Sequence, residues 1–137
     1  MVRIIVFLFV FFAGLSIFSQ SDSASCLFRI DTLTQIRYCL LCEKMAEPLG
    51  GMEGLLDTIT SNLVLKDQST IEGKIYIAFI VDEDGEISGE RTLRNPGYKD
   101  LYRQVIIIIK NYKWNAAECK GKKVPSLFIL PINVCYR

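Results

Sequence analysis

The sequence predicts an α+β fold in which two helices pack on one face of a three-stranded antiparallel sheet. Three observations carry this prediction: two segments with the apolar period of a helix, two strand-like segments separated by a tight turn, and a final apolar strand. In chain order they read helix, strand, strand, helix, strand, within residues 48–137. A chain of 137 residues is long enough for one such domain but not comfortably for two.

The first helix is predicted to begin after the chain breaker Pro48-Leu49-Gly50-Gly51 and to end near Leu65-Lys66. Apolar residues recur over this stretch at the 3.6-residue period of a helix, so one face is suited to a core. The members of this stripe are Met52, Leu55, Leu56, Ile59 and Leu63.

Two strands joined by a turn are predicted next. Lys74–Val81 is apolar on both faces, which indicates a central strand. Asp82-Glu83-Asp84-Gly85 is typical of a hairpin turn, with Gly85 free to adopt a positive φ. Glu86–Leu93 is the expected return strand.

The second helix is predicted over Tyr98–Tyr112. Its isoleucine run, Ile106–Ile109, has high strand propensity, but the apolar stripe extends over more than ten residues and burial overrides propensity. The last strand is expected over Val124–Cys135. Because Pro125 and Pro131 cannot donate to a ladder, we expect this strand at the edge of the sheet.

Residues 1–19 have the pattern of an export signal, in which Arg3 precedes the unbroken apolar run Ile4–Phe18. The run is short for a membrane-spanning helix, which needs about 20 residues. We therefore expect an exported protein whose signal peptide is removed, with an uncleaved membrane anchor as the alternative. Residues 20–47 form an N-terminal segment, in which a short helix is expected near Thr34–Met45.

The exported part contains five cysteines, an odd number that leaves at least one thiol free or paired between chains. The disulfide candidates are Cys39, Cys42, Cys119 and Cys135, and their connectivity does not follow from the spacing. Cys39 and Cys42 have the spacing of a redox motif, but no strand is predicted before them. A structural disulfide, or two unrelated thiols, is therefore favoured over an oxidoreductase.

The sequence carries no group of residues that supports catalysis. Histidine is absent, which removes the commonest general base and metal ligand. The carboxylate cluster Asp82–Glu86 does not fit a calcium loop, because Ile80 and Arg91 would stand at the first and last ligand positions. We expect no enzyme activity, no cofactor and no metal. A net charge of +1 argues against nucleic-acid binding, and membrane contact is expected only if the N-terminal segment is retained.

Several stretches, taken in order, resemble the C-terminal domain of TonB proteins of Gram-negative bacteria. They cover about residues 48–136 and are Gly50–Leu56, Ile71–Ile87, Lys113–Ala117, Gly121–Pro125 and Leu130–Ile132. The resemblance implies the same α+β fold. It also implies a periplasmic location, or an inner-membrane anchor facing the periplasm if the signal is not removed.

Members of this family pair their C-terminal strand with a short extended peptide, the TonB box, of outer-membrane transporters. The resemblance implies such strand addition here, since an exposed edge offers unpaired N–H and C=O groups. The partner would be a peptide of an outer-membrane TonB-dependent transporter or another envelope protein. Carried over by position, the partner-binding edge residues are Val124, Ser126, Leu127, Phe128, Ile129 and Leu130.

An alternative function stays open at this point. The chain would then be an exported structural or adaptor domain without energy transduction. Disulfides, or a homodimer formed through its own edge strand, would dominate its behaviour.

Overall fold

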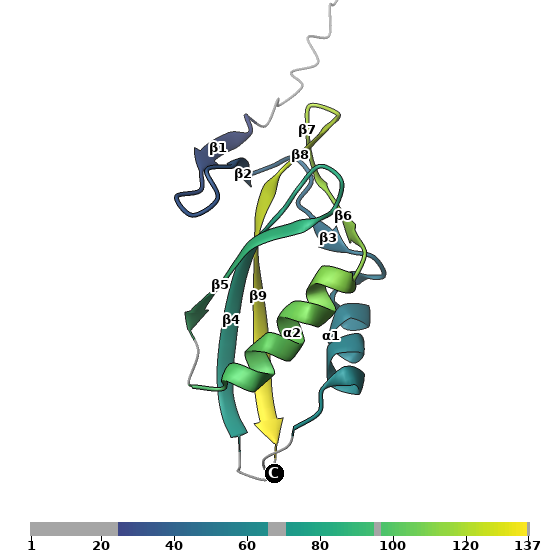
Figure 1. Ribbon diagram of the computed structural model, residues 1–137. Coiled ribbons are helices and arrows are strands. Elements are labelled where there is room, and N and C mark those ends of the chain that lie inside the picture. The colour runs from purple at the N-terminus through teal and green to yellow at the C-terminus, as the bar shows by residue number, and fades with distance from the viewer. Residues whose placement is uncertain (1–24, 66–70, 95–96, 137) are drawn as a thin grey trace, which may run out of the picture.

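The computed structural model of this chain describes residues 25–65, 71–94 and 97–136. The helices are α1 (Gly51–Asn62) and α2 (Lys99–Asn111) (Figure 1). The strands are β1 (Leu27–Ile30), β2 (Arg37–Leu41), β3 (Glu47–Pro48), β4 (Ile71–Val81), β5 (Ile87–Arg94), β6 (Trp114–Asn115), β7 (Ala117–Cys119), β8 (Lys122–Val124) and β9 (Ser126–Tyr136). None of the helices in these ranges is long and apolar enough to cross a membrane.

The main sheet contains five strands in the order β1-β2-β9-β4-β5. β4 pairs antiparallel with β5 on one side and, along its whole length, with β9 on the other. These three strands form the antiparallel sheet that the sequence predicts. The predicted number of strands in the sheet, three, is wrong, because the sheet has five. The N-terminal segment adds β1 and β2, and β2 runs parallel to β9, so the sheet is mixed. Two small sheets, β3–β6 and β7–β8, complete the fold.

The N-terminal segment is made of strands, and the helix expected near Thr34–Met45 is wrong. Gln35 has a φ of 60°, a left-handed conformation that no right-handed helix contains. The following residues form β2, where Tyr38 and Cys39 are buried against the rest of the sheet. Tertiary pairing therefore decides the conformation of a stretch whose apolar residues show no clean period. A domain boundary at residue 48 stays a prediction.

The core lies between the sheet and the two helices, which cover the same face (Figure 1). Alternate residues of β4 point into it, and Phe79 is fully buried between Trp114 and Phe128, with ring centroids 5.2 and 5.4 Å away. The Trp114 Nε1–H donates to the carbonyl of Ile109 at 3.0 Å, which satisfies its buried polar atom. The isoleucine run is helical, as predicted, because one of its faces fills this core.

α1 ends at Asn62, earlier than the predicted end near Leu65-Lys66. The side chain of Gln104 on α2 binds the backbone of Val64 twice: its Oε1 accepts from the Val64 N–H and its Nε2 donates to the Val64 carbonyl, both at 2.8 Å. This amide reproduces the pairing of a neighbouring strand. It therefore stabilises an extended chain where one more helical turn was expected.

A buried carboxylate fastens the β1–β2 hairpin to β5. Asp31 is 4% exposed and accepts hydrogen bonds from the N–H and hydroxyl of Thr34, at 2.9 and 2.8 Å, and from Arg91 Nη2 at 2.8 Å. Thr34 lies against β5 at Gly89, where an added Cβ would stand only 2.5 Å from Thr34 Cγ2. Burial by itself would raise the pKa of Asp31, but the bonds from Thr34 and the Arg91 guanidinium outweigh it and lower the pKa.

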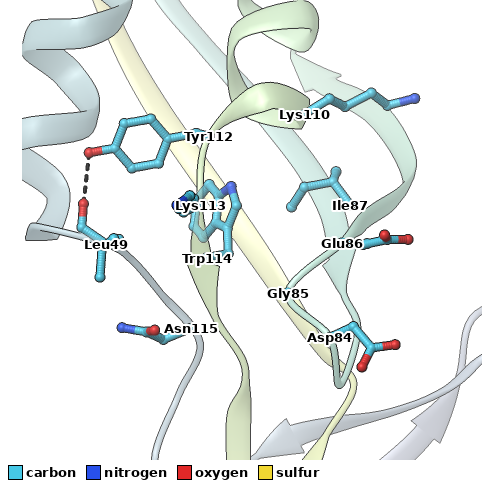
Figure 2. Close-up of a pocket in the computed structure, with 10 residues that line it drawn as sticks. All are labelled: Leu49, Asp84, Gly85, Glu86, Ile87, Lys110, Tyr112, Lys113, Trp114 and Asn115. Atoms are coloured by element: carbon cyan, nitrogen blue, oxygen red, sulfur yellow. Dashed lines mark hydrogen bonds between the residues drawn. The ribbon is translucent and has the colours of Figure 1, made fainter.

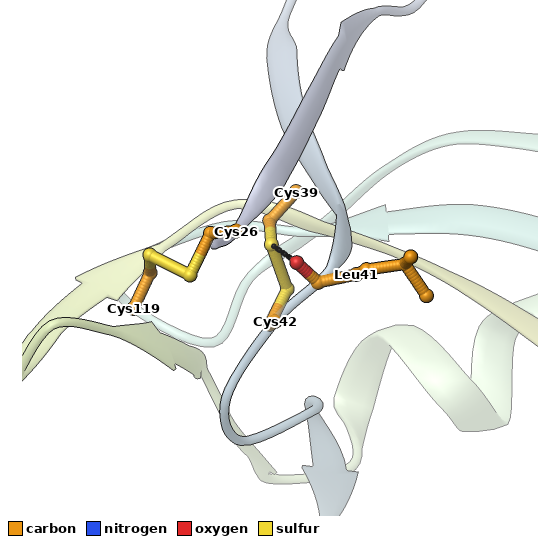
Figure 3. Close-up of a disulfide and its surroundings, with 5 residues drawn as sticks. All are labelled: Cys26, Cys39, Leu41, Cys42 and Cys119. Carbon is orange, nitrogen blue, oxygen red and sulfur yellow. Dashed lines mark hydrogen bonds between the residues drawn. A yellow bond between two sulfur atoms is a disulfide. The ribbon is translucent and has the colours of Figure 1, made fainter. Parts of the chain in front are cut away.

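Two disulfides fasten the same part of the chain (Figure 3). Cys26 is bonded to Cys119 at the end of β7, and Cys39 of β2 is bonded to Cys42. Cys135 is a free, exposed thiol, so the expectation that it forms a disulfide is wrong. Cys26, which was not among the predicted candidates, is the partner of Cys119. The Cys39 sulfur lies 3.0 Å from the Leu41 carbonyl oxygen, a contact without a proton in the disulfide state.

Asp31→Asn should destabilise the protein at neutral pH by about 1–3 kcal/mol, because a buried charge-assisted hydrogen bond is lost. Since the folded-state pKa is lowered, the carboxylate stabilises the fold above its ordinary value of 3.8, and this contribution is lost as pH falls through the folded-state value. Urea unfolding of both proteins at decreasing pH measures the difference. Asp57→Asn on exposed α1 is the control, and an Asp31→Asn effect that does not shrink in acid would contradict this account.

Removing the long-range disulfide should cost more. Cys26 and Cys119 are 93 residues apart in the chain, and Cys26→Ser with Cys119→Ser should lower the free energy of unfolding by about 2–5 kcal/mol. Thermal denaturation under non-reducing conditions checks this value. Cys135→Ser removes only the free thiol and should leave the melting temperature unchanged.

Candidate functional site

The outer edge of β9 is the candidate site. One edge of β9 is fully used by β4, from the pair Val81–Ser126 to the pair Ile71–Tyr136. On the other edge β2 contributes a single parallel pair, Cys39 with Ser126, and the Cys39 N–H donates to the Pro125 carbonyl at 2.7 Å. Beyond this pair, no strand in the described ranges lies along the outer edge of β9.

The Cys39 bond shows which backbone groups of β9 face outward. Since Pro125 points its carbonyl toward β2, and orientation alternates along an unbroken strand, every second residue from Pro125 onward faces the outer edge. These residues are Leu127, Ile129, Pro131, Asn133 and Cys135. Pro131 lacks an N–H and so interrupts the row of outward-facing donors. Because this missing N–H would point away from β4, the β4–β9 ladder loses no hydrogen bond.

The side chains of β9 divide between the two faces of the sheet. Leu130 and Ile132 are buried under the helices, and Phe128 packs on Trp114 with ring centroids 4.9 Å apart. On the opposite face Ile129 is 47% exposed. A strand added to this edge would therefore meet an apolar side chain on each face.

The predicted edge residues do not all lie on the open edge. Val124 belongs to β8 and pairs with Ala117, because Pro125 separates the two strands. Ser126 begins β9, but β2 covers its outer edge. Leu127 and Ile129 point their backbone groups to the outer edge, where β2 uses only the Leu127 N–H, whereas Phe128 and Leu130 point theirs to β4.

Sequence reasoning missed the second half of the edge, Asn133 and Cys135, and the role of β2. The period of two would have extended the row to Asn133 and Cys135, because the predicted strand already ran to Cys135. Nothing in the sequence around Cys39 indicates that it pairs with Ser126, because that contact joins segments 87 positions apart.

A surface pocket of about 540 Å³ lies at the turn between β4 and β5, against the chain that follows α2 (Figure 2). A Cβ at Gly85 would stand 2.3 Å from the Trp114 carbonyl oxygen, so only glycine permits this approach. Acidic Asp84 and Glu86 line the pocket together with basic Lys110 and Lys113. This mixture favours no single class of charged ligand.

One group of potential metal ligands occurs in the described ranges: Cys26, Glu43 and Cys119, whose donor atoms lie within 4.8 Å of one another. Since the two sulfurs are bonded to each other, neither is a thiolate that would ligate a cation. The group is therefore a disulfide with a neighbouring carboxylate.

Ser126 provides a test of the buried start of β9. Its hydroxyl is fully buried and has no hydrogen-bond partner among the described atoms. Ser126→Ala should therefore stabilise the protein by about 1 kcal/mol in urea unfolding. Ser88→Ala on half-buried β5 is the matched control, and a loss of stability in Ser126→Ala would show that the hydroxyl is bonded in solution.

Comparison with known proteins identifies the domain. No curated protein matches the chain. Residues 66–133 match the family described as Gram-negative bacterial TonB protein C-terminal, a range that includes β5, α2 and the open part of β9 up to Asn133. This family is a protein-interaction domain and not a family of enzymes. The chain therefore carries a TonB C-terminal domain and is a TonB-like module of the Gram-negative cell envelope.

Proposed function

We propose that this protein is an exported, periplasmic binding module that takes up an extended peptide of an outer-membrane transporter by strand addition to β9. The observation that carries the proposal is the open outer edge of β9 from Leu127 onward. The family match supports the partner class, because the matched residues contain this edge.

The charges on β9 and β5 support β9 as the binding edge. Proteins commonly protect free edges with charged side chains, which discourage pairing with other chains. β5 carries Glu90, Arg91 and Arg94, whereas β9 has no charged residue at all from Ser126 to Tyr136. An uncharged open edge is suited to a partner strand.

The backbone groups limit the length and strength of the added strand. Leu127 offers only its carbonyl, because the parallel pair of Cys39 with Ser126 uses the Leu127 N–H. Ile129 and Asn133 each offer a donor and an acceptor, and Pro131 again offers only its carbonyl. Each hydrogen bond contributes about 0.5–1.5 kcal/mol net, so these few bonds alone give weak affinity. Contacts with Ile129 on one face and Phe128 on the other would supply the rest and select the partner's side chains.

Ile129→Pro tests strand addition, because it removes an outward-facing N–H and leaves the β4–β9 ladder intact. Pro131 already occupies an equivalent position. Binding of synthetic N-terminal peptides of outer-membrane transporters, followed by fluorescence anisotropy, should weaken about tenfold, the value of one lost hydrogen bond of about 1.4 kcal/mol.

Ile129→Val is the matched control, since it keeps the N–H and an apolar side chain and should bind within about twofold of the wild type. Circular dichroism must show that Ile129→Pro retains the fold. Equal binding by the folded Ile129→Pro protein would rule out pairing at this position.

Self-association through the same edge is the second candidate. The exposed, free thiol of Cys135 lies on β9 and favours it. Analytical ultracentrifugation without transporter peptide distinguishes the two functions. The adaptor function would be supported if the wild type is a dimer, Ile129→Pro dissociates it, and the wild type binds no transporter peptide.

A further inference from the structure

The disulfide between Cys26 and Cys119 joins the start of the described fold to the candidate binding strand by a short covalent route. Cys119 ends β7, and only seven positions along the chain separate it from Ser126, the first residue of β9. The route from Cys26 to β9 through the chain itself is 100 positions long. The disulfide thus bypasses the hairpin and most of the domain.

β7 is firmly built into the body of the protein. Ala117 is fully buried and Cys119 is 7% exposed. β7 pairs with β8, and Glu118 exchanges two backbone hydrogen bonds with Lys44, at 3.2 and 2.9 Å. A pull on Cys119 is therefore shared among several hydrogen bonds and a buried segment.

The β1–β2 hairpin offers a weaker connection. β1 pairs only with β2 in the described ranges, and β2 reaches the remaining sheet through the single pair Cys39–Ser126. Leu27 pairs with Leu41 at the open end of the hairpin, so a pull on Cys26 away from Leu41 would break the β1–β2 hydrogen bonds one after another. Without the disulfide, these β1–β2 hydrogen bonds would be the first to bear a force applied at Cys26.

We propose that the Cys26–Cys119 disulfide carries mechanical load in this module and passes tension from the N-terminal segment through β8 into β9. The proposal rests on the proposed function, in which the partner is held on β9, and on the alternative of an uncleaved membrane anchor, which would tie the chain before Cys26 to the membrane. The hairpin then stays folded when the module is pulled, and its Asp31–Arg91 contact is not in the path.

Force spectroscopy on the full chain tests this link without any transporter peptide. One handle is attached at the N-terminus and the other at the exposed thiol of Cys135, which is the free cysteine of β9. Oxidised wild-type protein should show no early opening of the hairpin. After reduction of the same molecule, a low-force step of up to about 60 Å should appear, since residues 26–42 comprise 17 residues at about 3.6 Å each.

Two variants separate this disulfide from the other. Cys26→Ser with Cys119→Ser should show the early step without reductant, and full extension should be longer than that of oxidised wild type by about 330 Å for the 93 residues released. Cys39→Ser with Cys42→Ser keeps the proposed link and should show no early step until reduced. An early step in the oxidised wild type, or its absence after reduction, would overturn the proposal, whereas failed peptide binding bears only on the function of β9.

Discussion

The antiparallel pairing of β4 with β9 is the constraint on which the rest of the structure depends. It joins the two longest strands over eleven residue pairs without a register shift. Because side chains alternate, this register places Phe79 and Phe128 on the helix-covered face, and a slip of β9 by one residue would turn Phe128 to the face opposite Phe79. It also determines which backbone groups of β9 are used internally and which face outward.

The N-terminal hairpin completes the sheet without closing the site. It crosses to β5, where the Asp31–Arg91 ion pair and the contact at Gly89 hold it, and it touches the outer edge of β9 only at Ser126. Beyond Ser126, no strand of the described ranges pairs with this edge. If β2 had continued alongside β9, both edges of β9 would be paired within the sheet.

Disulfides and strands together give this end of the molecule its stiffness. Cys26 is bonded to Cys119 of β7 and Cys39 to Cys42, and the chain continues from β7 through β8 into β9. The strands β2 and β7, which carry Cys39 and Cys119, lie at the end of the fold opposite the C-terminal end of β9 (Figure 1).

The sequence by itself determined the two helices, the β4–β5 hairpin and the final strand, because each has a local period or a turn signal that needs no distant partner. The four-isoleucine stretch of α2 is the clearest case, since its stripe outweighed its propensity. Of the six predicted edge residues, Leu127 and Ile129 point backbone groups toward the outer edge of β9. Only the tertiary structure decided that Arg37–Leu41 is a strand, that Val64 is extended, and that Cys26 pairs with Cys119. Each of these rests on a contact between segments far apart in the chain, and such contacts leave no periodic trace in the sequence.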